Sequence, residues 1–172
     1  MPTSMYDLTV PLFRHMLGNL QGWLDKAKAE AERKGYPVDN LVTARLAPDQ
    51  YDLRKQVQAA CDTAKFTVAR VTGTPPPVHA DTEQTFPELA ARVASALAFV
   101  ESVPESAFEG AEERVVPLPF RPGKGAVGRS YVRDLQLPNF FFHLNHVYAI
   151  LRHNGVPLGK SDVITRVDLV DV

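Results

Sequence analysis

The chain has 172 residues, of which 45% are apolar, and its 19 Lys and Arg residues nearly balance its 20 Asp and Glu residues. This length suits one domain, which buries roughly 70% of its unfolded surface on folding. The single cysteine, Cys61, excludes a scaffold of intrachain disulfides and a zinc site built on several thiolates. A net charge of −1 argues against a nucleic-acid-binding protein, because such proteins usually carry a basic excess.

No segment has the pattern of a targeting signal or a membrane span. The first apolar stretch contains Asp7 and Arg14 and lacks a basic region before it, so we expect no secretory signal. The longest stretch without formal charge, residues 135–151, contains one proline, two asparagines, one glutamine and two histidines. Polar groups at this density are costly in lipid. We therefore expect a cytoplasmic protein that does not contact membranes.

Apolar residues at helical spacing predict two long helices in the first half of the chain. The first spans residues 10–34, with Thr9 as a candidate N-cap. The second carries an apolar stripe from Leu53 to Val71 and ends before Gly73. A proline-rich segment follows it and cannot continue the helix.

A third helix is predicted to begin at a capping box. Thr85 and Glu88 have the spacing in which each side chain binds the other residue's backbone N–H, and the apolar positions continue to a stop near Pro104. Residues 105–130 then depart from helical spacing. Their prolines and glycines predict a small hairpin or an ordered loop, with residues 126–127 as the return strand.

The last predicted helix follows Pro138 and continues to His153. It is apolar nearly all round, which is typical of a helix in the middle of a bundle or at a subunit interface. Four long helices and one long connection predict an all-α four-helix bundle, and residues 1–172 show neither an internal repeat nor a linker between domains.

Charge is distributed unevenly along the chain. Residues 81–114 carry eight acidic and two basic residues, whereas residues 115–153 carry five basic and one acidic residue. One interpretation is that these segments form two solvated surfaces that partly complement each other. The alternative is a small anionic ligand at the basic segment.

The polar residues of the last helix are the candidates for chemistry. Asn139, His143, His146 and His153 fall within a sector of roughly 80° when plotted at 100° per residue. Imidazole nitrogens with an amide or carboxylate oxygen suit Zn, Fe, Ni or Mn in a bundle core. A further ligand would have to come from another helix, and Asp62, beside the apolar stripe of the second helix, is the best candidate.

Each of these residues also has a structural interpretation. Asp62 has the spacing of a surface ion pair with Lys65. His143 can be a core histidine bonded to a backbone carbonyl, His146 an interface residue, and His153 a residue that stabilises the helix C-terminus.

The remaining reactive residue types lack a recognisable motif. Cys61 lies on the apolar stripe of the second helix, which predicts a buried and inert thiol. His15 and His79 have no partner at ligand spacing and are expected to be structural or to face solvent. The glycine-rich residues 121–128 lack the spacing of a phosphate-binding loop, so we interpret them as a hairpin turn.

Five segments, residues 6–11, 44–49, 62–65, 137–143 and 149–157, resemble a bacterial family of unknown function that is similar to a branch of the DinB/YfiT-like metalloenzymes. The resemblance covers nearly the whole chain. It implies an up-down-down-up four-helix bundle that is usually dimeric.

In that superfamily one histidine of the second helix and two histidines of the last helix hold a metal. By position, His143 corresponds to the second ligand of the last helix, Asn139 to the first, and Asp62 lies near the ligand of the second helix. Only one of the three positions is therefore a histidine here.

The leading hypothesis is a metal-dependent enzyme of unassigned reaction, with a pocket between the second and last helices lined by Asp62, Asn139, His143 and His146. One divalent Zn, Ni, Fe or Mn ion would act there as a Lewis acid or a source of bound hydroxide. The alternative is a non-catalytic bundle that binds a small molecule or a protein partner and has lost the metal. In either case we expect a homodimer.

Overall fold

The computed structural model describes residues 4–167 and 169–171. Four long helices make up most of this part of the chain: α1 (Val10–Lys34), α2 (Leu53–Thr72), α3 (Phe86–Ser102) and α5 (Leu137–His153). The shorter elements are the 3-10 turns η1 (Val38–Leu41), η2 (Glu105–Phe108) and η4 (Lys160–Asp162), the strands β1 (Val115–Pro117) and β2 (Gly125–Val127), the short helix α4 (Gly128–Ser130) and the π-helical segment η3 (Tyr131–Gln136).

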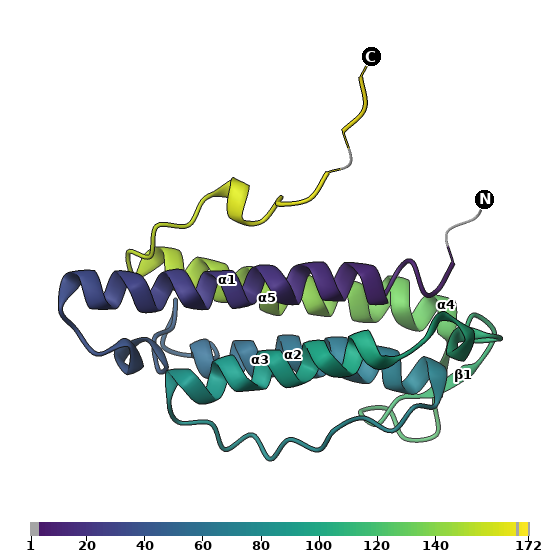
Figure 1. Ribbon diagram of the computed structural model, residues 1–172. Helices are drawn as coiled ribbons and strands as arrows, with labels where there is room; N and C mark the ends of the chain where they lie inside the picture. The colour runs from purple at the N-terminus through teal and green to yellow at the C-terminus, as the bar shows by residue number, and fades with distance from the viewer. Residues whose placement is uncertain (1–3, 168, 172) are drawn as a thin grey trace.

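The helices form a four-helix bundle, as the sequence predicts, with the up-down-down-up order that the family resemblance implies (Figure 1). α1 and α5 run in one direction and α2 and α3 in the other, so the connection between α2 and α3 returns along the length of the bundle (Figure 1). α2 packs against α5 and α3, and α1 packs against α3 and α5. The apolar stripes of all four helices meet in one hydrophobic cluster, in which Phe13 and Phe140 make an edge-to-face contact with ring centroids 4.9 Å apart.

The helix ends agree with the sequence signals at most positions. Thr85 and Glu88 form the predicted capping box at the start of α3, and Gly73 adopts the left-handed conformation after α2. Thr9 does not cap α1, contrary to expectation. Its hydroxyl instead donates to the backbone carbonyl of Met5 at 2.8 Å, because residues 5–9 already form turns ahead of the helix.

The predicted hairpin is confirmed, and the last predicted helix is found as α5 (Leu137–His153), but the helical turns that lead into it were not predicted. β1 and β2 pair antiparallel, and the chain becomes helical at Gly128 rather than after Pro138. Proline lacks a backbone N–H and its ring clashes with the carbonyl four residues earlier in an α-helix. The wide π-helical turns of η3 directly precede Pro138, so the helix passes into α5 without interruption.

Gly128 is required where the hairpin meets this helix. Its N–H donates to the carbonyl of Arg114 at 2.8 Å, and a Cβ built on Gly128 would overlap the carbonyl oxygen of Ala111. Any larger residue must therefore displace the backbone at this junction.

After α5 the chain lies along α1. The indole N–H of Trp23 donates to the carbonyl of Asp162 at 2.8 Å, and the side-chain amide of Asn19 donates to the carbonyl of Val163 at 2.9 Å. The His15 ring lies 2.6 Å from the hydroxyl of Thr165. These side chains of α1 therefore hold residues 162–165 against the bundle.

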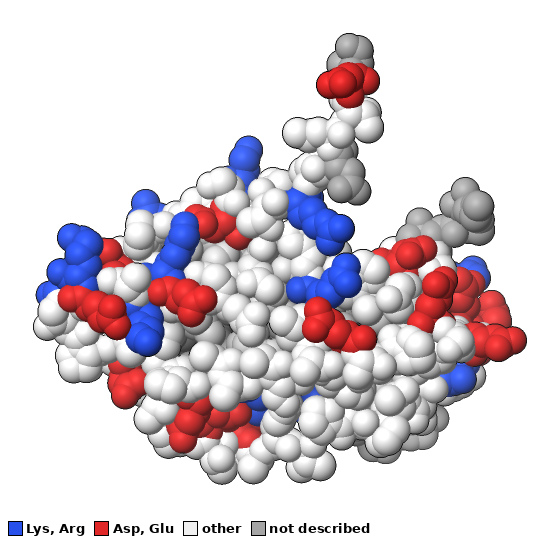
Figure 2. Space-filling model, in the orientation of Figure 1, with Lys and Arg blue, Asp and Glu red and all other residues white. Residues whose placement is uncertain are grey.

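Charge on the surface follows the uneven distribution in the sequence. Acidic side chains gather at the end of the molecule where η2 and β1 lie (Figure 2). Arg129 binds Glu112 at 2.7 Å and approaches Glu113 at 3.7 Å, which joins the acidic segment to the basic one. Among the described residues, no helix combines the length and apolarity that crossing a membrane requires.

Candidate functional site

α5 carries three of the four predicted site residues on the side that faces α2. At its beginning, the side-chain amide of Asn139 donates to the hydroxyl of Thr63 at 2.8 Å. That hydroxyl in turn donates to the carbonyl of Ala59 within α2 at 2.7 Å. Asn139 is therefore already engaged in a hydrogen bond between the two helices.

His143 contacts α2 through a buried glutamine. Its Nδ1 lies 2.8 Å from Oε1 of Gln56, a residue that is only 2% exposed. A carbonyl oxygen accepts only, so Nδ1 carries the proton and Nε2 keeps its lone pair. Among the described residues no group forms a hydrogen bond with this Nε2. The atom is not buried either, so it is open to a partner from outside the protein. Burial, with a smaller contribution from His146, lowers the pKa of His143, so its ring is neutral at neutral pH.

His146 has the same tautomer as His143. Its Nδ1 donates to the carbonyl of Phe142 at 2.6 Å, and its Nε2 accepts from the side-chain amide of Gln50, 3.3 Å away. The other end of that amide, Oε1 of Gln50, is buried without a hydrogen-bond partner.

Two exposed aromatic rings flank His143. The Tyr51 ring is nearly parallel to the imidazole, with centroids 6.4 Å apart, and the Phe142 ring contacts it edge to face at 5.2 Å. Tyr51 is 54% and Phe142 55% exposed, so both present apolar surface to solvent beside a polar ring. We call the group Gln50, Tyr51, Gln56, Thr63, Asn139, Phe142, His143 and His146 the α2–α5 site.

The structure does not bring Asp62 to this site. Its carboxylate binds Lys65 and Arg92, each at 2.8 Å, which places it against α3 on another side of α2. The ion pair with Lys65, the structural interpretation of Asp62, is therefore found, but it is not a surface pair, because the side chains of Lys65 and Arg92 are only 2% and 1% exposed. Gln56, not Asp62, is the α2 residue that contacts His143.

The side chains present do not fit the metal expected from the sequence. His143 offers one free imidazole nitrogen, whereas the nitrogen of His146 and the amide of Asn139 already have protein partners. Zn, Ni, Fe and Mn sites in bundles need several imidazole, carboxylate or thiolate ligands that converge on one point. In the part of the chain that the structure describes, no three His, Cys, Asp or Glu side chains are grouped in this way.

Cys61 is fully buried, as its position on the apolar stripe predicts. Burial raises the pKa of its thiol to about 12, so the reactive thiolate is not formed at neutral pH.

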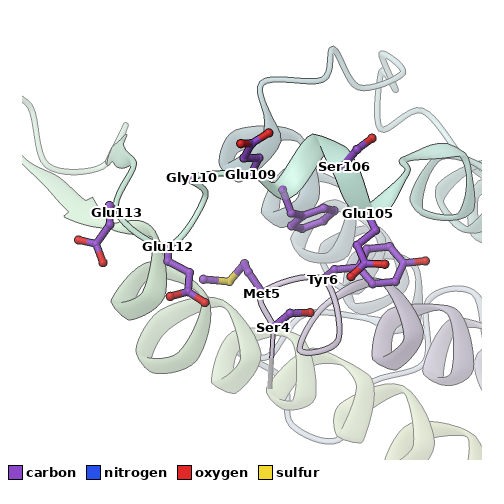
Figure 3. A pocket seen from close by; sticks show the side chains of 10 residues that line it. Ser4, Met5, Tyr6, Glu105, Ser106, Glu109, Gly110, Glu112 and Glu113 are labelled. Carbon is purple, nitrogen blue, oxygen red and sulfur yellow. The ribbon is translucent and has the colours of Figure 1, made fainter. Parts of the chain in front are cut away.

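Two hollows bear on the choice of site. One, of about 410 Å³, adjoins the α2–α5 site, with which it shares Gln50 and Tyr51. The charged side chains that line this hollow already form ion pairs with protein groups, for example Lys55 with Asp81. Another, of about 420 Å³, lies beside η2 and is lined by Tyr6 and Glu105 among others (Figure 3). Its walls carry four glutamates, but no further group there indicates a ligand.

Sequence reasoning missed Gln56, Thr63 and Tyr51. Gln56 and Thr63 are seven residues apart, so they lie on one face of α2, and a polar pair at this spacing inside a buried helix was a usable signal. Tyr51 precedes α2, and its place beside His143 depends on the path of the chain before the helix.

The helix order and the pairing of α2 with α5 define a DinB-like four-helix bundle. A crystal structure described as a DinB family member protein from Shewanella denitrificans is similar to the chain, with 43% sequence identity, a TM-score of 0.92, and coverage of 98% of this chain and 96% of that chain. Residues 5–164 match the family described as domain of unknown function (DUF1993), and the chain belongs to this family. No curated protein matches the sequence. The resemblance inferred from the sequence is thereby confirmed.

Proposed function

We propose that the chain binds a small neutral molecule at the α2–α5 site, which is the non-catalytic alternative of the sequence analysis. One observation carries this proposal: a neutral imidazole, fixed through Nδ1 by the buried Gln56, keeps a free acceptor at Nε2 between two exposed aromatic rings. The ligand class that matches is a compact molecule with one hydrogen-bond donor on an apolar or aromatic body.

The uncharged lining supports a neutral ligand. The eight residues of the site include no Asp, Glu, Lys or Arg, and the imidazole of His143 is held neutral. A charged ligand would lose its hydration there without gaining an opposite charge. A hydroxyl, amine or amide N–H can donate to His143 Nε2 while the apolar part of the ligand contacts Tyr51 and Phe142.

The test compares phenol with toluene, two rings of similar size of which only phenol donates a hydrogen bond. In NMR titrations we expect phenol to shift the ring resonances of Tyr51, which stacks on His143, at lower concentration than toluene. The variant His143→Phe keeps an aromatic ring but removes the acceptor, so it should abolish the difference. His153→Phe, at the exposed end of α5, is the matched control and should leave it intact. Equal responses to both compounds would overturn the proposal.

The metal-dependent enzyme is the second candidate, and one observation favours it. His143 and His146 both donate from Nδ1, the arrangement usual for metal-bound histidines, which bind through Nε2. Metal analysis of protein purified without chelators distinguishes the two candidates. Stoichiometric Zn, Ni, Fe or Mn that is lost in His143→Phe and retained in Asp62→Asn would favour the enzyme. Metal-free protein whose melting temperature does not change when these ions are added would favour the proposal that the chain binds a small neutral molecule.

The homodimer and the cytoplasmic location stay predictions. We propose that a second copy, if it binds, covers the exposed ring of Phe142, because the uncharged stretch 135–151 continues around that residue. Sedimentation velocity tests this: Phe142→Ser should weaken the dimer, whereas Phe120→Ser, at a ring of the hairpin region that is 62% exposed, should not.

A further inference from the structure

The long connection between α2 and α3 is held against the bundle by side chains rather than by secondary structure. Residues 74–85, which we call the strap, contain no helix or strand and run along α2 and α3 (Figure 1). At the end of the strap nearest α3, ion pairs hold it: Asp81 binds Lys55 at 3.1 Å and Arg92 at 3.0 Å, and Glu83 binds Arg92 at 2.8 Å.

The middle of the strap has one polar anchor, His79. Its Nδ1 lies 3.0 Å from Nζ of Lys65 in α2, and its Nε2 lies 2.9 Å from the hydroxyl of Ser95 in α3. Val78, the preceding residue, is 95% exposed, and the three residues before it are prolines without an N–H. No other side chain of residues 75–80 forms a described hydrogen bond with the helices.

The partners of His79 fix where its proton lies. An ammonium only donates, so Nδ1 of His79 accepts from Lys65, and Nε2 therefore carries the proton and donates to Ser95. The pair Ser95 and His79 has the spacing of a nucleophile and its base, but this tautomer cannot remove the serine proton. The contact is a positional anchor, not a catalytic dyad.

The groups around His79 oppose a second proton on its ring. Lys65, 2% exposed, and Arg92, 1% exposed, face it from α2 and α3. The carboxylates that face it, Asp62 and Glu83, are each bound to one or both of these cations. Burial, then the charges of Arg92 and Lys65, lower the pKa of His79, and the carboxylates offset this only in part.

We propose that the strap is an acid-released latch: a proton on Nδ1 of His79 breaks the contact with Lys65 and frees residues 75–80 from the bundle. Once Nδ1 of His79 carries a proton, it can no longer accept from Nζ of Lys65, 3.0 Å away. The positive imidazolium then also repels the positive ammonium. The hollow of about 290 Å³ that His79, Arg92 and Ser95 line is already open on one side, and it loses the His79 wall. The side chain of Lys65, 2% exposed while the strap is docked, then reaches solvent.

The direction of the pH effect follows from linkage. His79 is neutral in the docked strap and has its ordinary pKa near 6.5 in the free one, so docking is fully favoured above that value and is lost as the pH falls below it. Residues 81–84 stay bound in the same range. Burial by itself would raise the pKa of Asp81, but hydrogen bonds from Lys55 and Arg92 outweigh it and lower the pKa overall.

NMR relaxation of the backbone amides of Val78, His79 and Ala80 tests the latch. At about pH 7.5 we expect the order parameters of rigid backbone, near 0.85, and at about pH 5 values below about 0.6. The amides of Glu83 and Gln84 should stay ordered at both pH values. Order in Val78–Ala80 that does not change with pH would overturn the proposal.

Two variants separate the proton from the mere presence of the side chain. His79→Gln keeps an acceptor for Lys65 and a donor for Ser95 without titrating, so the strap should stay ordered at about pH 5. His79→Lys carries a permanent charge and should be mobile at both pH values. His153→Gln, which removes an exposed histidine of α5, is the control. In this variant Val78–Ala80 should lose order between about pH 7.5 and pH 5, as in the wild type. Release of the strap at acid pH in His79→Gln would contradict the proposal.

Discussion

The side-chain oxygen of Gln56 lies 2.8 Å from Nδ1 of His143, and this contact joins the first turn of α2 to the middle of α5, the two helices that pack most extensively against each other. It fixes the tautomer of the histidine on which the proposed binding site depends.

Replacing Gln56 with Leu should disturb both stability and tautomer. The buried N–H of His143 would lose its acceptor, which costs about 1–3 kcal/mol of unfolding free energy. Nitrogen NMR of the imidazole should change from one tautomer to a mixture. Gln50→Leu, which removes a partner of His146 only, is the matched control. A wild-type imidazole spectrum in Gln56→Leu would contradict the assigned role.

Acid should destabilise the fold partly through His143. Burial lowers its pKa in the folded protein, so the unfolded chain binds the proton more readily. The stability that this neutral ring contributes is present above about pH 6.5 and is lost as the pH falls. Urea denaturation at a series of pH values measures the free energy of unfolding. Between neutral and acid pH this free energy should fall less in His143→Gln than in the wild type. An identical pH dependence would show that the ring does not contribute.

Arg92→Met should be strongly destabilising. The guanidinium is 1% exposed and binds Asp62, Asp81 and Glu83, and removing one partner of a buried ion pair typically costs about 3–5 kcal/mol. Chemical denaturation measures the loss. Arg133→Ala breaks a solvent-exposed pair with Asp134 and should leave the midpoint unchanged. Similar effects of the two variants would mean that the buried network contributes no more than a surface pair.

Two glycine-to-alanine substitutions should act in opposite directions. Gly128→Ala forces a Cβ onto the carbonyl of Ala111, so we expect reduced stability and altered amide shifts in β2 and η3. Gly22→Ala lies inside α1 with nothing within 4 Å, and alanine there should stabilise the helix by up to about 1 kcal/mol. Thermal unfolding of both variants checks the signs, and a neutral Gly128→Ala would contradict the described junction.

The fold followed from local signals that act over a few residues. The spacing of apolar residues, the capping box at Thr85 and the glycine at Gly73 placed α1, α2 and α3. Pro138 marked the start of α5 to within two residues, but the helical turns of α4 and η3 before it were missed, because proline is compatible both with a first helical turn and with a π-helical distortion inside a continuous helix.

The site was less predictable because it depends on contacts between distant segments. Asp62 had a visible partner three residues away in Lys65, but Arg92, which fixes its direction, is 30 residues away. His143 was identified from its helix alone, whereas its acceptor Gln56 lies 87 residues earlier. Spacing along a helix shows which side chains share a face, and the partner across the bundle has to come from tertiary structure.

The contact between Trp23 and the segment after α5 provides an intrinsic optical probe. Trp23 is the chain's single tryptophan, and its indole N–H is bound to the backbone of Asp162 beside the ring of Tyr148. Its emission spectrum therefore responds when residues 162–165 leave α1, even while the helices remain folded. Fluorescence can thus follow the detachment of this segment separately from global unfolding, without any added label.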